Sequence, residues 1–73
     1  MDDVQTAWET ARTALEMHAR LGVQLQRRGL ELLGEGENLR DAQGLISEGV
    51  RMEADAKLRI YQLERNKPKK GRA

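Results

Sequence analysis

The stretch Leu39–Leu63, LRDAQGLISEGVRMEADAKLRIYQL, decides the fold that we expect for this chain. Small or apolar residues recur in it at every third or fourth position, which is the spacing of one face of an α-helix. A single charged residue, Glu53, interrupts that face. The stretch therefore predicts a long helix whose face packs against a second helix. The residues of this face are Leu39, Ala42, Ile46, Gly49, Glu53, Ala56, Ile60 and Leu63.

A matching pattern precedes this stretch and predicts the partner helix. It consists of Val4, Trp8, Ala11, Leu15, His18, Gly22, Leu25, Gly29 and Leu32, with His18 as its one polar member. We expect helix 1 over about residues 3–33, a turn over residues 34–38 that is favoured by Gly34 and Gly36, and helix 2 over about residues 39–66. Asn38 or Asp41 is the expected N-cap of helix 2. Because the connection is short, the fold class is all-α, an antiparallel two-helix hairpin.

The two patterns also predict which residues meet if Leu32 faces Leu39 across the turn. Gly22 then lies opposite Gly49, which predicts a close crossing, either within the hairpin or between subunits. The alternative is a kink or break of helix 1 near Gly22, since glycine weakens a helix.

The same register places His18 opposite Glu53 and Trp8 opposite Leu63. A polar pair on a packing face fixes register and partner, and a carboxylate would raise the pKa of His18 and couple assembly to pH. The alternative is that both side chains lie at the edge of the face and reach solvent. Trp8 and Tyr61, near the open end, are candidate anchors for a partner. The alternative, which a monomer would favour, is that Trp8 closes the core of the hairpin.

Composition predicts that the hairpin assembles further. The chain has 73 residues, no cysteine, one histidine and two aromatic residues, and 34% of it is charged. So small a core rarely supplies more than about 3–5 kcal/mol, and two hairpins in a helical bundle or ring would cover flanks that one leaves exposed. Those flanks contain Ala7, Ala14, Leu21, Leu45, Val50 and Met52. No apolar run reaches membrane-spanning length and the N-terminus is acidic, so we expect a cytoplasmic protein.

The charge is divided between the body and the C-terminal tail. Residues 1–66 carry nine Lys/Arg and twelve Asp/Glu, a net −3, whereas residues 67–73 carry four Lys/Arg and no acid, a net +4. We expect the tail to be disordered in isolation and to contact nucleic-acid phosphates, with a solubilising terminus as the alternative. The candidate nucleic-acid residues are Lys67, Lys69, Lys70, Arg72, Arg27 and Arg28.

Two segments carry a family resemblance: ALEMHARLGVQLQRRGLELL (residues 14–33) and DAQGLISEGVRMEADA (residues 41–56). Together they resemble the helical region that follows the helix-turn-helix in small-terminase-like proteins of phages and prophages. The matching residues are His18, Ala19, Leu21, Gly22, Leu25, Gln26, Gly49, Val50, Met52 and Glu53. In that family the helix-turn-helix binds DNA and the following helices assemble a ring. Here the residues before Trp8 leave no room for a helix-turn-helix, so the resemblance implies only the assembly part.

These observations favour a non-enzymatic, oligomerising module of phage or prophage origin, associated with a DNA-handling complex in a bacterial host. The alternatives are a small helical inhibitor or adaptor that docks onto a larger host or phage protein, and a dimerising fragment of a phage structural or scaffold protein. No catalytic signature is present, and we expect no cofactor and no metal. The candidate interface residues are Trp8, Leu15, His18, Gly22, Leu25, Ile46, Gly49, Glu53, Ile60, Tyr61 and Leu63.

Overall fold

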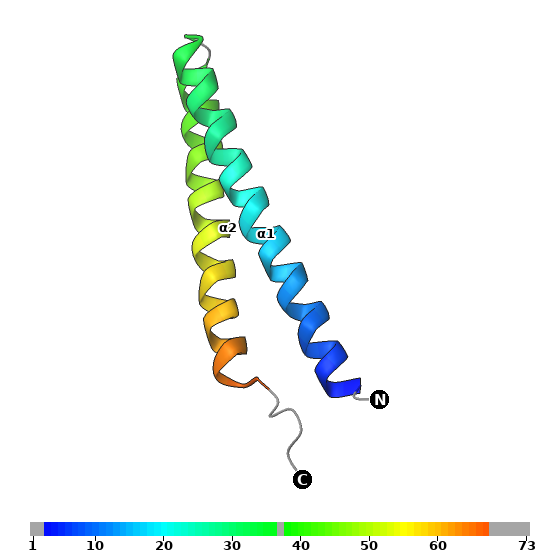
Figure 1. Ribbon diagram of the computed structural model, residues 1–73. Helices are drawn as coiled ribbons and strands as arrows, with labels where there is room; N and C mark the ends of the chain where they lie inside the picture. The colour runs from blue at the N-terminus through cyan, green and yellow to red at the C-terminus, as the bar shows by residue number, and fades with distance from the viewer. Residues whose placement is uncertain (1–2, 37, 68–73) are drawn as a thin grey trace.

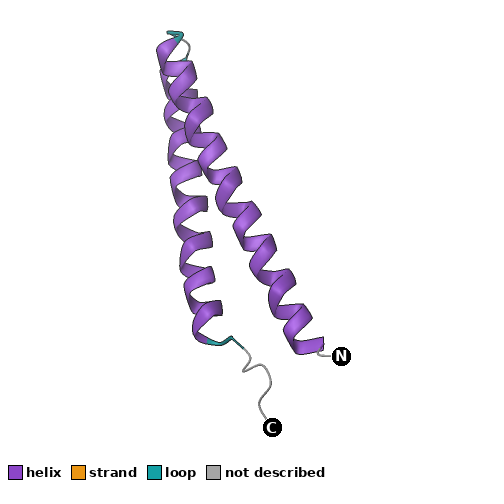
Figure 2. Cartoon of the chain, in the orientation of Figure 1, coloured by secondary structure: helices purple, strands orange, loops and turns teal. Residues whose placement is uncertain are grey.

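The fold is an antiparallel hairpin of two α-helices, seen in a computed structural model that describes residues 3–36 and 38–67. Helix α1 spans Asp3–Gly34 and helix α2 spans Leu39–Arg65. Figure 1 shows the start of α1 and the end of α2 at the same end of the molecule, and the described part of the chain contains no strand (Figure 2). The predicted all-α hairpin is thus confirmed. The molecule is thin, with extents of 60 × 18 × 12 Å.

The helix ends have identifiable physical causes. Gly36 adopts φ +73°, a left-handed conformation that glycine accepts without strain, and so reverses the chain directly after α1. Asn38 is the N-cap of α2, because its side-chain oxygen accepts hydrogen bonds from the backbone N–H groups of Arg40 (2.9 Å) and Asp41 (3.2 Å). Of the two predicted caps, Asn38 is therefore the correct one. Glu37, also part of the predicted turn, lies outside the described residues.

The closest contact between the helices is made by glycine and alanine. A Cβ atom added to Gly22 would lie 2.7 Å from the carbonyl oxygen of Gly49 and 2.8 Å from the amide nitrogen of Glu53. The two backbones therefore touch directly, which confirms the predicted crossing of Gly22 and Gly49 and places it within the hairpin. Helix α1 runs through Gly22 without interruption, so the predicted alternative of a break is wrong. The buried residues of the described chain are Gly22, Gly29, Ala42, Gly49 and Ala56.

Larger apolar side chains flank this contact and are only partly covered. Leu15, Leu25, Ile46 and Ile60 are half-buried, and no large side chain is fully buried within residues 3–36 and 38–67. A close helix crossing thus leaves most apolar side chains at the margins of the contact. The core of the hairpin is therefore a line of small residues, and few other side chains are shielded from solvent.

One part of the predicted register requires correction. His18 and Ala11 are exposed, whereas Arg12, Ala19 and Gln26, each one residue later in the sequence than the position expected, are partly buried. Helix α1 is therefore rotated about its axis relative to the prediction. Arg12 and Gln26 form hydrogen bonds to Glu64 and Glu53 of α2, and these bonds favour the rotation. The spacing of apolar residues, from which the register was predicted, does not reveal such hydrogen bonds.

Candidate interaction surfaces

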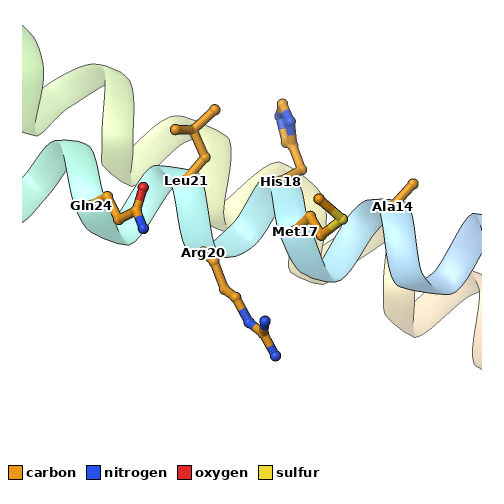
Figure 3. Close-up of a pocket in the computed structure, with 6 residues that line it drawn as sticks. All are labelled: Ala14, Met17, His18, Arg20, Leu21 and Gln24. Carbon is orange, nitrogen blue, oxygen red and sulfur yellow. The ribbon is translucent and has the colours of Figure 1, made fainter.

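The outer side of α1 carries two shallow depressions that adjoin at Ala14 and Met17. One, of about 570 Å³, is lined by Ala14, Met17, His18, Arg20, Leu21 and Gln24 (Figure 3). The other, of about 390 Å³, is lined by Thr6, Glu9, Thr10, Thr13, Ala14 and Met17. In Figure 3 the side chains of Ala14, His18 and Leu21 project to one side of α1, while that of Arg20 projects away from them.

We define the outer stripe of α1 as Ala7, Thr10, Ala14, Met17, Leu21 and Gln24. These residues alternate at spacings of three and four, so they follow one line along the helix, and none of them is charged. All six are exposed, with Met17 at 63% and Leu21 at 46% of their full accessible surface. An uncharged line of this kind in a chain that is 34% charged is typical of a helix-packing surface.

A groove runs between the helices near the open end. Its two parts, of about 490 and 280 Å³, share Ala14 and Leu15 of α1 and Arg59 of α2. Asp55 and Gln62 also line it, and Asp55 pairs with Arg59 at 3.0 Å. On the α2 side, Leu63 lines the groove together with charged and polar residues, whereas the α1 side adjoins the outer stripe.

A polar network crosses between the helices along the later contact line of α1. The amide of Gln26 donates a hydrogen bond of 2.8 Å to the carboxylate of Glu53, which also pairs with Lys57 at 2.8 Å. The hydrogen bond from Lys57, followed by that from Gln26, holds the pKa of Glu53 below its ordinary value. Burial opposes this effect, but more weakly than the Lys57 bond because Glu53 keeps 24% of its side-chain surface exposed.

A second ionic contact joins the helices nearer the termini. Arg12 pairs with Glu64 of α2 and with Glu16 of its own helix, both at 2.5 Å. The contact with Glu64 is the main cause that raises the pKa of Arg12 above its ordinary value. These pairs are partly exposed, so they orient the helices more than they stabilise them.

The predicted pairing of His18 with Glu53 is not made within the chain. Glu53 binds Gln26 and Lys57 instead, while His18 is exposed and borders the groove beside Asp55 and Arg59. The rotation of α1 is the physical reason, because it turns His18 away from the contact line. The alternative expectation was that both side chains lie at the edge of the packing face and reach solvent. The exposed position of His18 agrees with that alternative.

The two aromatic residues of the open end have different environments. Trp8 is half-buried, and its indole N–H donates a hydrogen bond of 2.8 Å to the backbone carbonyl of Leu63. That carbonyl lies in the last turn of α2 and also accepts a hydrogen bond of 3.1 Å from the backbone N–H of Asn66, the C-cap residue. The ammonium group of Lys67 lies 5.3 Å from the centre of a Trp8 ring. Trp8 thus closes the hairpin, whereas Tyr61 is 60% exposed.

The remaining interface candidates form the contact between α1 and α2. Gly22 and Gly49 are buried, and the half-buried group contains Leu15, Leu25, Ile46, Ile60 and Leu63. Further exposed apolar side chains are those of Val4, Leu30, Leu33, Leu39, Val50 and Leu58. The surface left for a partner therefore differs from most of the predicted set.

The basic candidates do not form one patch within the described chain. Arg27 and Arg28 are exposed on α1, and Arg28 contacts Glu31 at 3.4 Å. Lys67 lies beside Trp8, which is about 28 Å along the axis of α1 from Arg27 at 1.5 Å per residue. Lys69, Lys70 and Arg72 lie outside the described residues.

No family model, curated protein sequence or solved structure matches the chain. Neither helix is long and apolar enough, over the described residues, to span a membrane. Within the same residues, no three His, Cys, Asp or Glu side chains are grouped closely enough to hold a metal ion.

Sequence reasoning identified half of the outer stripe but not its continuity. Ala7, Ala14 and Leu21 were expected to remain exposed on a single hairpin, and they do. Thr10 and Gln24 were missed because they are polar, so a search for apolar spacing does not detect them. Without them, the apolar Met17 was not connected to the line of the other three residues. The sequence does contain a signal for the stripe: six positions spaced three or four residues apart, and therefore on one side of α1, carry no charged residue.

Proposed function

We propose that this chain is a non-enzymatic, self-associating helical module that serves a DNA-handling complex of phage or prophage origin in the bacterial cytoplasm. One observation carries the self-association: among residues 3–36 and 38–67, only small residues are fully buried, while Met17, Leu21 and other large apolar side chains face solvent. A chain with so little interior gains most by covering such side chains against another molecule. The resemblance to small-terminase-like proteins and the basic tail support the association with DNA.

The proposed contact with DNA is electrostatic and independent of base sequence. Four basic residues within residues 67–73 would neutralise phosphates, and each subunit of an oligomer would add its own tail. Binding should therefore weaken steeply with salt, with a slope of about 0.9 per neutralised phosphate in a double-logarithmic plot.

The test is the solution mass of the purified protein by light scattering, at low and at physiological salt, with and without a short DNA duplex. We expect a defined oligomer that gains mass with DNA at low salt. A variant that lacks residues 67–73 serves as the matched control, and we expect it to keep its oligomeric mass and to lose the salt-dependent DNA binding. A monomer that ignores DNA would contradict the proposal.

A second candidate function is an inhibitor or adaptor that docks its open end onto one larger protein. The observation in its favour is that Val4, Leu58 and Tyr61 are each at least 56% exposed and belong to the terminal half of the hairpin. This function would be compatible with a monomer, and it would be unaffected by removal of residues 67–73.

A further inference from the structure

The outer stripe of α1 changes in side-chain size along its length. Its first three residues, Ala7, Thr10 and Ala14, are small, and its last three, Met17, Leu21 and Gln24, are large. A partner that complements this surface must be large where the stripe is small and small where it is large. The stripe itself, turned end to end, meets that requirement.

We propose that two copies of the chain associate through their α1 helices, antiparallel, with the two-fold axis passing between Ala14 and Met17 of the outer stripe. This inference rests on the proposed self-association and specifies its geometry. In an antiparallel helix pair, the two alternating positions of one seam face each other across the axis. Ala14 then faces Met17 of the other copy, Thr10 faces Leu21, and Ala7 faces Gln24.

A parallel pair would fit the same stripe poorly. Each residue would meet its own copy, so Ala7 and Ala14 would face alanines while Met17 and Leu21 would face equally large side chains. The helices would then have to touch at one end of the stripe and separate at the other. Only the antiparallel order gives every layer one small and one large side chain.

Charge favours the same order. Residues 3–15 of α1 carry Asp3, Glu9 and Arg12, a net −1, and residues 16–28 carry Glu16, Arg20, Arg27 and Arg28, a net +2. An antiparallel pair brings the negative half of each α1 beside the positive half of the other. A parallel pair would bring like halves together.

Helix α2 offers no comparable surface beside the groove. The residues that α2 contributes there include Asp55, Arg59 and Gln62. Covering two charged side chains that now reach water would cost more than covering the uncharged stripe. Exposed apolar side chains of α2, among them Val50, Leu58 and Tyr61, do not line the groove. The proposed contact is between two α1 helices, because the outer stripe of α1 complements itself in side-chain size and in charge.

The area is sufficient for a reversible dimer. From Ala7 to Gln24 the stripe is about 26 Å long at 1.5 Å per residue. At the diameter of a single helix, about 10–12 Å, the two copies together cover on the order of 600 Å². This value lies below the standard size of specific interfaces, so we expect a weak, concentration-dependent dimer.

Disulfide trapping tests this geometry, and the absence of natural cysteine makes single substitutions informative. In the antiparallel dimer, Thr10→Cys and Leu21→Cys face each other when the two variants are mixed, whereas each variant alone keeps its two thiols about 16 Å apart along the axis. A disulfide requires Cα atoms within about 7 Å. Gln43→Cys, at an exposed position of α2, is the control for random collision.

We expect the mixture of Thr10→Cys and Leu21→Cys to give roughly tenfold more covalent dimer than either variant alone or than mixtures with Gln43→Cys. Helical circular dichroism verifies that the variants fold. Dimer formation by each single variant would indicate a parallel pair and overturn the inference. An oligomeric mass without trapping in any mixture would also overturn it, yet leave the proposed function standing. A monomeric mass would remove both.

Discussion

Two glycines of α2, five residues apart, occupy opposite environments. A Cβ atom at Gly49 would lie 2.9 Å from the amide nitrogen of Gln26, whereas nothing lies within 4 Å of one at Gly44. Gly49→Ala should therefore push the helices apart and destabilise the hairpin by about 1–3 kcal/mol. Gly44→Ala should stabilise it by about 1 kcal/mol, because alanine favours the helix and meets no obstacle.

Thermal unfolding followed by circular dichroism distinguishes the two glycine variants. Each serves as the control for the other, since both make the same chemical change in the same helix. Equal stabilisation by both substitutions would mean that the backbones do not touch at the crossing.

A pH dependence is expected from Glu53, whose pKa is lowered by Lys57 and Gln26. A lowered pKa in the folded chain means that folding favours the carboxylate. This stabilisation is complete above the ordinary pKa of glutamate, near 4.3, and is lost as the pH falls through the lower value of the folded state. Glu53→Gln should therefore reduce the decrease of the melting temperature between about pH 6 and about pH 3.

Glu48→Gln is the matched control for that measurement. Glu48 carries the same group on the exposed surface of α2 and makes no ion pair among the described residues. We expect its substitution to leave the acid dependence of the melting temperature almost unchanged. An identical effect of both substitutions would contradict a specific role of the network around Glu53.

At the scale of single residues, the sequence predicted contacts that depend on size and missed those that depend on hydrogen bonding. Gly22 and Gly49 could be paired because two glycines in register allow two helix backbones to touch, and residue size can be read directly from the sequence. The partners of Glu53 could not be predicted from the sequence. Gln26 and Leu25 are neighbours that could each face α2, and only the structure shows the hydrogen bond to Glu53 that favours Gln26.

At the scale of the helices, the turn and the N-cap of α2 could be predicted from the sequence because their causes are local. Gly36 reverses the chain and Asn38 caps α2 through atoms two and three residues away. The rotation of α1 about its axis could not be predicted from the sequence, since the line of residues that contains Leu25 and the neighbouring line that contains Gln26 have the same spacing. A choice between them depends on Arg12, Gln26 and their partners on the other helix.

The surfaces of the two helices also have different roles. Helix α1 is contacted by α2 on one side and presents an uncharged stripe on its outer side. Helix α2 presents Asp55, Arg59 and Gln62 beside the groove, and its exposed apolar side chains, among them Val50, Leu58 and Tyr61, lie outside the groove. In the proposed dimer, α1 forms the contact between the copies and α2 supports α1.

For the whole molecule, the stability of the hairpin should depend on its concentration. A dimer stabilises the folded chain by mass action, by about 2.7 kcal/mol at a concentration one hundred times the dissociation constant. The melting temperature of the unmodified chain should then rise with protein concentration. Leu21→Glu places a charge in the proposed contact and should abolish this rise.

Leu30→Glu provides the matched control for the concentration series. Leu30 is 60% exposed and lies nine residues, or two and a half turns, beyond Leu21, which places it on the opposite side of α1. The same chemical change should there preserve the concentration dependence. If Leu30→Glu abolished the rise and Leu21→Glu did not, the contact between copies would include the exposed surface around Leu30, and the outer stripe would have to serve a different partner. If neither substitution changed the rise, α1 would not form the contact, and exposed apolar side chains of α2, among them Val50, Leu58 and Tyr61, would become the surface to test.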